Sequence, residues 1–492
     1  MGDLILTDSK VLNIITFDGD DDPSNAVNWP RRTKWSIVGV LSVMTLTTAL
    51  ASSMLTPGVG QIMTDFESNS EILRSFVVSV YILGYASGPL IIAPLSELYG
   101  RQLLYNITNV LCVIFTVACA LSPSLGSLIV FRLLAGMAGS AVLNIGGGTI
   151  ADLFIQEERG TAMSVWTVGP LLGPVIGPVA GGFLSEAKGW RAVFWVLSGL
   201  VSQATIRLAA LAHAIAFQIF AITVSFFFVM RETYPPIILE RKAARLRKET
   251  GNPYLRSKMD SGLDSKQMFK RAIVRPLKLL TLSPIVFSFS IFIAVVYGYL
   301  YLLFTTMPQV FGTQYGFSEG LIGLTYLGIG GGMLVGVSIF GIASDRILRS
   351  KSRNGEMKPE YRLPLMTPGA FLIPAGLFIY GWTAEKQVFW LVPILGTSLV
   401  GLGLNTTFMS IQTYLVDAFT LHAASALAAN TVLRSTVGAL LPLAGPPMHA
   451  HFGLGWGNSI LGFFAVAMIP MPFLFIKYGE AIRKNPKFEL SL

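Results

Sequence analysis

The chain has 492 residues, of which 52% are apolar and only 13% are charged, and its formal net charge is +9. Soluble domains carry about 25% charged residues, so this composition excludes a soluble globular protein. Apolar runs of roughly twenty residues recur along the chain, and each can cross a hydrocarbon core about 30 Å thick. The sequence therefore predicts an all-α polytopic membrane protein whose first partner is the lipid bilayer.

Twelve apolar spans are expected, six on either side of a polar stretch, and this division predicts two six-helix bundles. The expected organisation is a disordered cytoplasmic N-terminus at 1–34, an N-terminal bundle at 35–230, a basic central loop at 231–276, a C-terminal bundle at 277–478 and a cytoplasmic tail at 479–492. The spans are expected at 35–55, 73–95, 103–122, 127–151, 161–184, 191–230, 281–304, 320–343, 362–382, 388–415, 423–447 and 456–476.

Basic residues set the expected orientation in the membrane. The central stretch 231–276 holds twelve basic and five acidic residues, whereas the loop 56–72 holds three acidic residues and no basic one. Cytoplasmic loops carry an excess of Lys and Arg, so the central loop and both termini should be cytoplasmic. No nucleic-acid partner is expected, because the positive charge follows this membrane rule.

The sixth expected span is anomalous in length. Residues 191–230 are about twice as many as one crossing needs, and no cluster of turn-forming residues divides them. Two crossings would invert every later loop and place the basic stretches outside. We therefore interpret 198–219 as a surplus insertion, from a translated intron or an error in the gene prediction. A single very long, tilted helix is the alternative.

The fifth expected span contains a repeated glycine–proline pattern. Its glycines recur every four residues, so on a helix they form a stripe that lets another helix approach closely. Each proline removes one backbone hydrogen bond, so we expect a bent helix in which the carbonyls of Trp166, Pro170 and Pro174 need donors from neighbouring protein. The pattern consists of Gly169, Pro170, Gly173, Pro174, Gly177, Pro178 and Gly181.

A short charged motif occurs at corresponding places in the two halves of the chain. The segment 93–101, after the second span, contains Glu97 and Arg101, and a degenerate copy with Asp345 and Arg346 follows the eighth span. This recurrence points to an internal six-helix repeat. An acid and an arginine at a helix end can lock one cytoplasmic face by ion pairing.

Together with Arg132, which lies inside the fourth span where a charge is costly, these motifs resemble the major facilitator superfamily. The resemblance is to its twelve-helix drug:proton antiporter branch and covers about residues 22–485, apart from 198–219. Several further stretches narrow it to the fungal members of that branch. They are 22–30, 34–35, 231–234, 239–242, 359–363 and 425–430.

The resemblance implies alternating access, in which two bundles rock about a central cavity and the glycine–proline helix lies at their interface. A second glycine stripe, at Gly328, Gly332 and Gly336, would be its partner, so the two stripes would meet. Ordinary helix packing within one bundle is the alternative. The residues expected to lock the cytoplasmic face or couple transport to protons are Glu97, Arg101, Arg132, Asp152, Asp345 and Arg346.

Polar and aromatic residues within the spans are the candidates for the substrate cavity. Amides and tyrosines suit broad binding of amphiphiles by stacking and a few hydrogen bonds. For any single tyrosine, an anchoring or packing role is the alternative. The candidates are Tyr81, Tyr85, Asn144, Tyr297, Tyr301, Asn405, Asn430 and Arg434.

Acidic residues are absent from the middle of the expected spans, whereas Arg132 and Arg434 lie well inside. This favours neutral or weakly acidic substrates over polyamines and leaves Glu97 and Asp152 as proton carriers by elimination. We expect a monomeric, proton-driven exporter of small organic compounds (drugs, toxins or secondary metabolites) in a fungal plasma membrane. An uncoupled facilitator, a polyamine exporter and a transport-dead sensor are the alternatives.

Enzymatic chemistry is not expected, because no paired catalytic residues and no metal-ligand spacing occur. The glycine clusters at 146–148 and 330–332 lack the lysine–serine pair and the preceding strand of a phosphate-binding loop. We therefore expect no nucleotide, no metal and no cofactor, with the proton gradient as the driving force.

Overall fold

The computed structural model describes residues 14–19, 21–201, 230–260, 262, 264–351, 358–419 and 423–485. Nearly all of these residues lie in helices, and ten segments among them are long and apolar enough to cross a membrane. The last segment, Ser425–Arg483, has 59 residues, enough for two crossings, and its backbone turns at Gly453, where φ is +75°. The all-α polytopic membrane fold is therefore confirmed.

The expected count of twelve helices stays a prediction, because the sixth span falls largely outside this description. Its first part is α8 (Trp190–Val201), and the next described residue is Met230. The surplus insertion predicted at 198–219 lies outside the described residues except for its first four, which continue α8.

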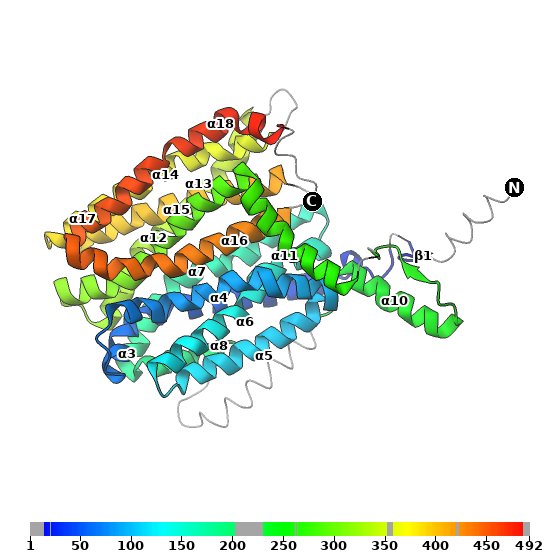
Figure 1. Ribbon diagram of the computed structural model, residues 1–492, viewed down its shortest axis with the longest axis horizontal. Coiled ribbons are helices and arrows are strands. Elements are labelled where there is room, and N and C mark those ends of the chain that lie inside the picture. The colour runs from blue at the N-terminus through cyan, green and yellow to red at the C-terminus, as the bar shows by residue number, and fades with distance from the viewer. Residues whose placement is uncertain are drawn as a thin grey trace.

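The N-terminal bundle consists of long helices that run roughly side by side (Figure 1). They are α2 (Arg31–Ser53), the short α3 (Val59–Asp65), α4 (Glu71–Tyr99), α5 (Arg101–Ala120), α6 (Leu125–Leu153), α7 (Gln156–Lys188) and α8. Within this bundle α2 packs against α7, α4 against α6, and α5 against α6 and α8. A one-turn 3-10 helix, η2 (Thr56–Gly58), joins α2 to α3.

The C-terminal bundle repeats this arrangement. Its elements are α12 (Pro284–Gln314), α13 (Glu319–Lys351), η3 (Pro359–Leu365), α14 (Met366–Glu385), α15 (Leu391–Ala418), α16 (Ala423–Leu440), η5 (Leu441–Ala444), α17 (Gly445–Met468) and α18 (Pro470–Arg483). Within it α13 packs against α15, α14 against α15 and α17, and α12 against α16. The two bundles meet mainly where α7 packs against α13 and where α4 packs against α16.

Local sequence explains where several of these helices begin and end. The side chains of Ser70 and Ser124 accept backbone N–H groups in the first turns of α4 and α6, which satisfies otherwise unpaired donors. Pro284 occupies the first turn of α12, where its missing N–H costs nothing. Gly100 ends α4 with a φ of +95°, a conformation that strains residues with a Cβ atom.

The predicted central loop is largely structured. It forms α10 (Pro235–Thr250), the short strand β2 (Arg256–Ser257) and most of α11 (Ser265–Leu282), which packs against α4 and α16. The strand β1 (Ile14–Ile15) pairs in parallel with β2. This pairing corrects the expected disorder of 1–34 for its described part, residues 14–19 and 21–34, where η1 (Ala26–Asn28) follows β1.

Asp22 organises this N-terminal segment. Its carboxylate accepts hydrogen bonds from the Ser24 hydroxyl and from the backbone N–H groups of Ser24 and Asp18. Lys242 of α10 pairs with Asp22 at 3.4 Å and with Asp18 at 2.7 Å. The Ser24 hydrogen bonds are the main reason that the pKa of Asp22 lies well below its ordinary value. The ionised Asp22 carboxylate and its pairing with Lys242 therefore tie the N-terminal segment to α10.

The two ends of the bundles carry different elements. The α10 end carries α10 and β1, on the right in Figure 1, and the α3 end carries α3, on the left. Arg101 starts α5 at the α10 end, beside the residues that precede α10. Glu319 starts α13 at the α3 end, where it contacts Gln61 of α3.

Candidate functional site

The glycine–proline helix α7 lies between α2 of its own bundle and α13 of the other. It stays helical through its three interior prolines. The carbonyl of Trp166, which Pro170 deprives of its helical donor, accepts a hydrogen bond from the Thr45 hydroxyl of α2 at 3.4 Å. The Ser53 hydroxyl of α2 donates to the carbonyl of Gly173 at 3.2 Å. The Thr45 hydroxyl also lies 2.9 Å from the Ser42 carbonyl of its own helix, so α2 offers the Trp166 carbonyl a shared donor.

The two glycine stripes do not meet, so that expectation is wrong. A Cβ atom added at Gly173 would collide with Ala49 of α2, and the other glycines of this stripe face α2 or Met54, which follows it. The stripe of α13 faces α15 of its own bundle, and a Cβ atom at Gly328 would lie 2.7 Å from the Ile394 carbonyl oxygen. Each stripe therefore allows close packing inside one bundle, which was the alternative.

Other small residues bring α7 and α13 together. A Cβ atom at Gly323 of α13 would lie 2.5 Å from the Pro178 carbonyl oxygen of α7, and one at Gly330 would lie 2.6 Å from Val175. On α7, Gly182 is equally close to the backbone of Glu319. The backbones of α7 and α13 therefore lie in close contact where the bundles meet. The face of α7 that touches α13 is next to the face that carries the predicted glycine stripe.

An ion pair joins two of the predicted locking residues at the α10 end. The Arg101 guanidinium of α5 lies 2.5 Å from the Asp152 carboxylate at the end of α6, and the two side chains are only 13% and 12% exposed. Thr233 donates a hydrogen bond to Asp152 at 3.3 Å. The carboxylate of Glu232 accepts the backbone N–H of Arg101 at 3.0 Å, which satisfies a donor in the first turn of α5.

Tyr234 covers the Arg101 guanidinium, with its ring centroid 5.0 Å from Cζ. Burial is the main cause that raises the pKa of Tyr234 to about 12, and the nearby negative charge of Glu97 adds to it. The phenol therefore stays neutral beside the guanidinium and stabilises it through the face of the ring.

Glu97 connects this region to the linker helix. It lies in the last turns of α4, where Arg101 and Arg275 of α11 act electrostatically on its carboxylate. Because α11 packs against both α4 and α16, this acid lies where the linker touches both bundles.

The C-terminal bundle contains a matching ion pair that the sequence motif did not indicate. Arg362, in the turn before α14, pairs with Asp417 at the end of α15 at 3.1 Å. Arg362 also donates to the Ser344 hydroxyl of α13 at 3.0 Å. Of the two predicted locking residues in this half, Arg346 is exposed, and the side chain of Asp345 lies outside the described residues.

Arg132 lies in the core of the N-terminal bundle and is 1% exposed. It donates to the Val78 carbonyl at 3.4 Å, and its guanidinium lies over the rings of Tyr81 at 5.3 Å and Phe194 at 5.7 Å. These ring faces and the carbonyl stabilise its charge. The contacts of Arg132 are therefore within its own bundle.

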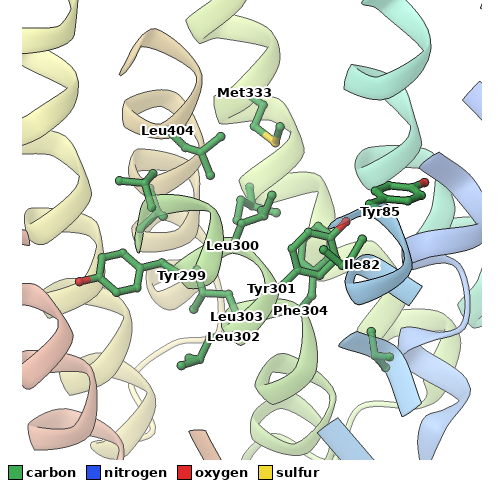
Figure 2. Packing of buried hydrophobic residues seen from close by; sticks show 14 of the residues in the cluster. Ile82, Tyr85, Tyr299, Leu300, Tyr301, Leu302, Leu303, Phe304, Met333 and Leu404 are labelled. Atoms are coloured by element: carbon green, nitrogen blue, oxygen red, sulfur yellow. The ribbon is translucent and has the colours of Figure 1, made fainter. Parts of the chain in front are cut away.

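Four of the predicted tyrosines lie as two pairs on helices of opposite bundles. Tyr81 and Tyr85 of α4 have ring centroids 5.3 Å apart, and Tyr297 and Tyr301 of α12 have centroids 5.1 Å apart. Figure 2 shows Tyr301 turned toward α4, beside Tyr85 and Ile82. The structure therefore brings these four residues together at the contact between the bundles.

Two hydrogen bonds position these rings. The Tyr301 hydroxyl donates to the Ser52 hydroxyl of α2 at 3.2 Å, and the Tyr85 hydroxyl donates to the Thr48 carbonyl at 2.9 Å. The first of these bonds joins the C-terminal bundle to the N-terminal bundle. Tyr299 points to the opposite side of α12, where its hydroxyl donates to the Leu461 carbonyl.

Arg434 and Asn430 of α16 complete this central cluster. The Arg434 guanidinium lies 4.8 Å from the ring centroid of Tyr297 and 5.2 Å from that of Phe408 on α15. Asn430 is fully buried, and among the described residues neither polar atom of its side chain has a hydrogen-bond partner. Arg434 Nε also lacks a partner within the same described part. Buried polar groups normally have partners, so Arg434 Nε and Asn430 Nδ2 are free to donate hydrogen bonds to a ligand, and Asn430 Oδ1 is free to accept one.

The other two predicted amides have structural contacts elsewhere. Asn405 of α15 donates to the Met333 carbonyl of α13 at 3.0 Å and so joins two helices of one bundle. Asn144 of α6 donates to the Ser140 carbonyl and faces α4 at Gly88. The central cluster therefore consists of the two tyrosine pairs, Asn430 and Arg434, and both amides bond elsewhere.

Comparison with known proteins decides the family. The profile of the Major Facilitator Superfamily matches residues 41–442. The chain is 55% identical over 480 residues to the MFS-type transporter penM of Penicillium rubens, covering 97% of this chain and 91% of that protein. It is 52% identical to the efflux pump radE of Floropilus chiversii, covering 98% and 86% of the two chains. The chain belongs to the Major Facilitator Superfamily.

Solved structures of this superfamily share the fold. A D-xylose–proton symporter superposes with a TM-score of 0.64 at 17% identity, covering 90% of this chain and 97% of the symporter. A bacterial Spinster homologue in an inward-facing conformation gives 0.66 at 14% identity, covering 93% and 100%. The chain is thus a Major Facilitator Superfamily membrane transporter for small molecules, and it is not an enzyme.

The internal repeat of this superfamily explains the residues that sequence reasoning missed. Arg362 and Asp417 occupy the same places in their bundle as Arg101 and Asp152. In each bundle the arginine lies at the start of the third membrane span (α5, or η3 with α14), and the aspartate lies at the end of the fourth (α6 or α15). Glu232 and Arg362 both lie in stretches that resemble the family (231–234 and 359–363), but the resemblance gave neither of them a structural role. Superposing the two halves of the sequence by span number could have found the Arg362–Asp417 pair.

Proposed function

We propose that this transporter exports small organic compounds by alternating access and that protons drive the export. One relative is named an efflux pump, and one structural neighbour is named a proton symporter. We further propose that it works as a monomer in a fungal plasma membrane, with both termini in the cytoplasm. The α10 end is then cytoplasmic, in keeping with its basic residues, and the α3 end is external.

The observation that carries this proposal is the central cluster between the bundles. Asn430 and Arg434 offer unpartnered hydrogen-bonding atoms, and the rings of Tyr297 and Phe408 flank the guanidinium. Such a cluster suits a planar organic compound that carries an acceptor oxygen. Because the cluster draws on both bundles, a substrate bound there would be released when the bundles rock apart.

Charge defines the proposed substrate class. The acidic residues of the long helices, such as Glu97 and Asp152, lie near helix ends, whereas Arg434 lies in the central cluster. A cationic polyamine would meet the arginine without a compensating carboxylate. We therefore propose neutral or weakly acidic drugs, toxins or secondary metabolites as substrates.

Proton coupling is assigned to the α10 end. Asp152, paired with Arg101, and Glu97, which faces Arg101 and Arg275, are the proposed proton carriers. Protonation would neutralise the carboxylate and weaken the ion pair. This would loosen the contact among α5, α6 and the linker, so that the bundles can change orientation.

The experiment reconstitutes the purified protein in liposomes and measures transport of fluorescein, a weakly acidic aromatic dye, and of spermidine. We expect fluorescein transport to depend on an imposed pH gradient and spermidine transport to be absent. Arg434→Gln should lower fluorescein transport by roughly tenfold, the effect of one lost hydrogen bond to a charged group. Arg245→Gln, at an exposed position of α10, is the matched control and should have no effect.

Each rival function predicts another result in the same assay. An uncoupled facilitator would transport fluorescein at the same rate without a pH gradient. A polyamine exporter would prefer spermidine, and a sensor would transport neither compound. Any of these outcomes would overturn the proposed function.

A further inference from the structure

The α3 end of the molecule contains a second set of contacts between the bundles, separate from the locking residues at the α10 end. Gln61 of α3 donates to the Glu319 carboxylate of α13 at 2.9 Å. Glu186, near the end of α7, accepts the backbone N–H of Gly320 at 2.8 Å and the Ser318 hydroxyl at 3.2 Å. All three hydrogen bonds cross from the N-terminal bundle to the C-terminal bundle.

Gln61 is held in place on its own side. Its side-chain amide also donates to the Ser185 carbonyl at 3.0 Å, and its carbonyl oxygen accepts the backbone N–H of Trp190 at 2.9 Å. Three elements of the N-terminal bundle, α3, α7 and α8, therefore fix the amide that reaches Glu319. A side chain with so many partners loses little further entropy when it forms the contact between the bundles.

The donors that reach these two carboxylates are neutral. Two nearby arginines are engaged elsewhere, because Arg191 pairs with Asp65 at 3.0 Å and Arg74 pairs with Glu71 at 3.1 Å. Hydrogen bonds from neutral donors to a carboxylate are stronger than those between two neutral groups but weaker than a buried ion pair. A contact of this strength can hold the bundles together and still open during a transport cycle.

A small pocket lies directly behind these contacts. It has a volume of about 160 Å³, and Glu319 forms part of its wall. Both bundles line it, with Thr56 and Val78 on one side and Thr305 and Gln309 on the other. Thr305 follows Tyr301 by one helical turn, so the pocket lies between the central cluster and the α3 end.

We propose that Gln61 and Glu186 form the outer gate of the transport path, closing the α3 end by their hydrogen bonds to Glu319, Ser318 and Gly320. The direction in which substrate passes this gate rests on the proposed export function. The gate itself does not depend on that proposal. A substrate leaving the central cluster passes the pocket at Thr305 and leaves once α7 and α13 separate at this end. Gln61 and Glu186 are positioning residues, since they act on the bundles and not on the substrate.

The first test measures access to the pocket and needs no substrate. Thr305→Cys is introduced into a protein whose buried Cys112 and Cys119 are replaced by alanine, and the reaction with an impermeant thiol reagent is timed. Adding Gln61→Leu or Glu186→Gln should accelerate labelling by roughly tenfold, because the first change removes a hydrogen bond between the bundles and the second removes the negative charge that strengthens two of them.

Matched controls exist at the same end of the molecule. Gln387 donates to Gln314 at 2.7 Å, and Glu385 accepts the backbone N–H of Gly455 at 2.7 Å, both within the C-terminal bundle. Gln387→Leu and Glu385→Gln should leave the labelling rate of the Thr305→Cys protein unchanged. Equal rates for the gate variants and these controls would overturn the proposal.

The second test locks the gate covalently. Gln61→Cys with Glu319→Cys spans the bundles, whereas Gln61→Cys with Ser185→Cys lies within one bundle and is the control. A short bifunctional methanethiosulfonate reagent should stop fluorescein transport only in the first pair, and a reducing agent should restore it. If cross-linking leaves the first pair active, the gate is refuted. If the protein with native Gln61, Ser185 and Glu319 does not transport fluorescein, the export proposal fails, and the labelling rates still decide the gate.

Discussion

The hydroxyl of Thr45 on α2 donates a hydrogen bond to the carbonyl of Trp166 on α7, which Pro170 leaves without its helical donor. The bond links a proline inside the membrane helix α7 to a hydroxyl group on α2, the helix packed against it. Since lipid offers no donors, the neighbouring helix must satisfy such a carbonyl.

Thr45→Val should therefore destabilise the protein by about 1 kcal/mol, the usual net value of one hydrogen bond. The control is Thr47→Val, because the buried Thr47 hydroxyl bonds only within its own helix, to the Val43 carbonyl. Thermal unfolding in detergent should show a lower midpoint for the first variant than for the second. Equal midpoints would mean that the Trp166 carbonyl does not depend on Thr45.

Gly173→Ala should reduce the yield of folded protein, because the added methyl group would collide with Ala49 and force α2 away from α7. Overpacking of this kind costs about 1–3 kcal/mol. Gly331→Ala is the control, since an added Cβ atom there meets no atom within 4 Å. Size-exclusion chromatography after solubilisation measures the outcome, and normal yield of Gly173→Ala would contradict the close α2–α7 packing.

Asp152→Asn should impair the protein more than Asp417→Asn, although the two acids form equivalent ion pairs. The Arg101–Asp152 side chains are 13% and 12% exposed, whereas Asp417 is 40% exposed. Breaking a buried pair costs about 3–5 kcal/mol, and an exposed pair contributes about 0–1 kcal/mol. Thermal midpoints compare the stabilities of the two variants.

Asp152→Asn and a second variant, Glu97→Gln, test the proposed coupling. Asp152→Asn, and separately Glu97→Gln, should remove the dependence of fluorescein transport on the pH gradient more than they weaken fluorescein binding. If both keep gradient-driven transport, the proton site lies elsewhere.

Arg434→Lys and Asn430→Ala should change the ranking of transported compounds while the amount of protein in the membrane stays normal. Lysine keeps the charge but loses the planar stacking on Tyr297 and Phe408. The measurement is a transport panel of aromatic acids and neutral compounds, normalised to surface expression. An unchanged ranking with reduced expression would indicate that Arg434 has a structural role instead.

Single cysteines should report the orientation in the membrane. Arg245→Cys on α10 should resist an impermeant thiol reagent added to intact cells, and Thr64→Cys on α3 should react, since both positions are exposed. The native Cys112 and Cys119 are buried and should contribute little background. The reverse pattern would overturn the proposed topology.

The amino-acid sequence by itself determined the class of fold and the places where charges lie. Apolar runs of membrane length demand helices, because lipid cannot hydrogen-bond an open backbone. Tyr81 and Tyr85, Tyr297 and Tyr301, and Asn430 and Arg434 each stand four residues apart, so helix geometry alone places each pair on one face. These relations are local, so periodicity alone predicts them.

Only the tertiary structure decided which helix each stripe or charge faces. The two predicted glycine stripes, on α7 and α13, face α2 and α15 and not each other, because a stripe indicates that some helix approaches closely but not which one. The partner of Arg362 lies 55 residues away, and Gln61 and Glu319 are separated by 258 residues. Such pairs depend on how two bundles dock, and that docking is set by the sum of many weak packing contacts along whole helices.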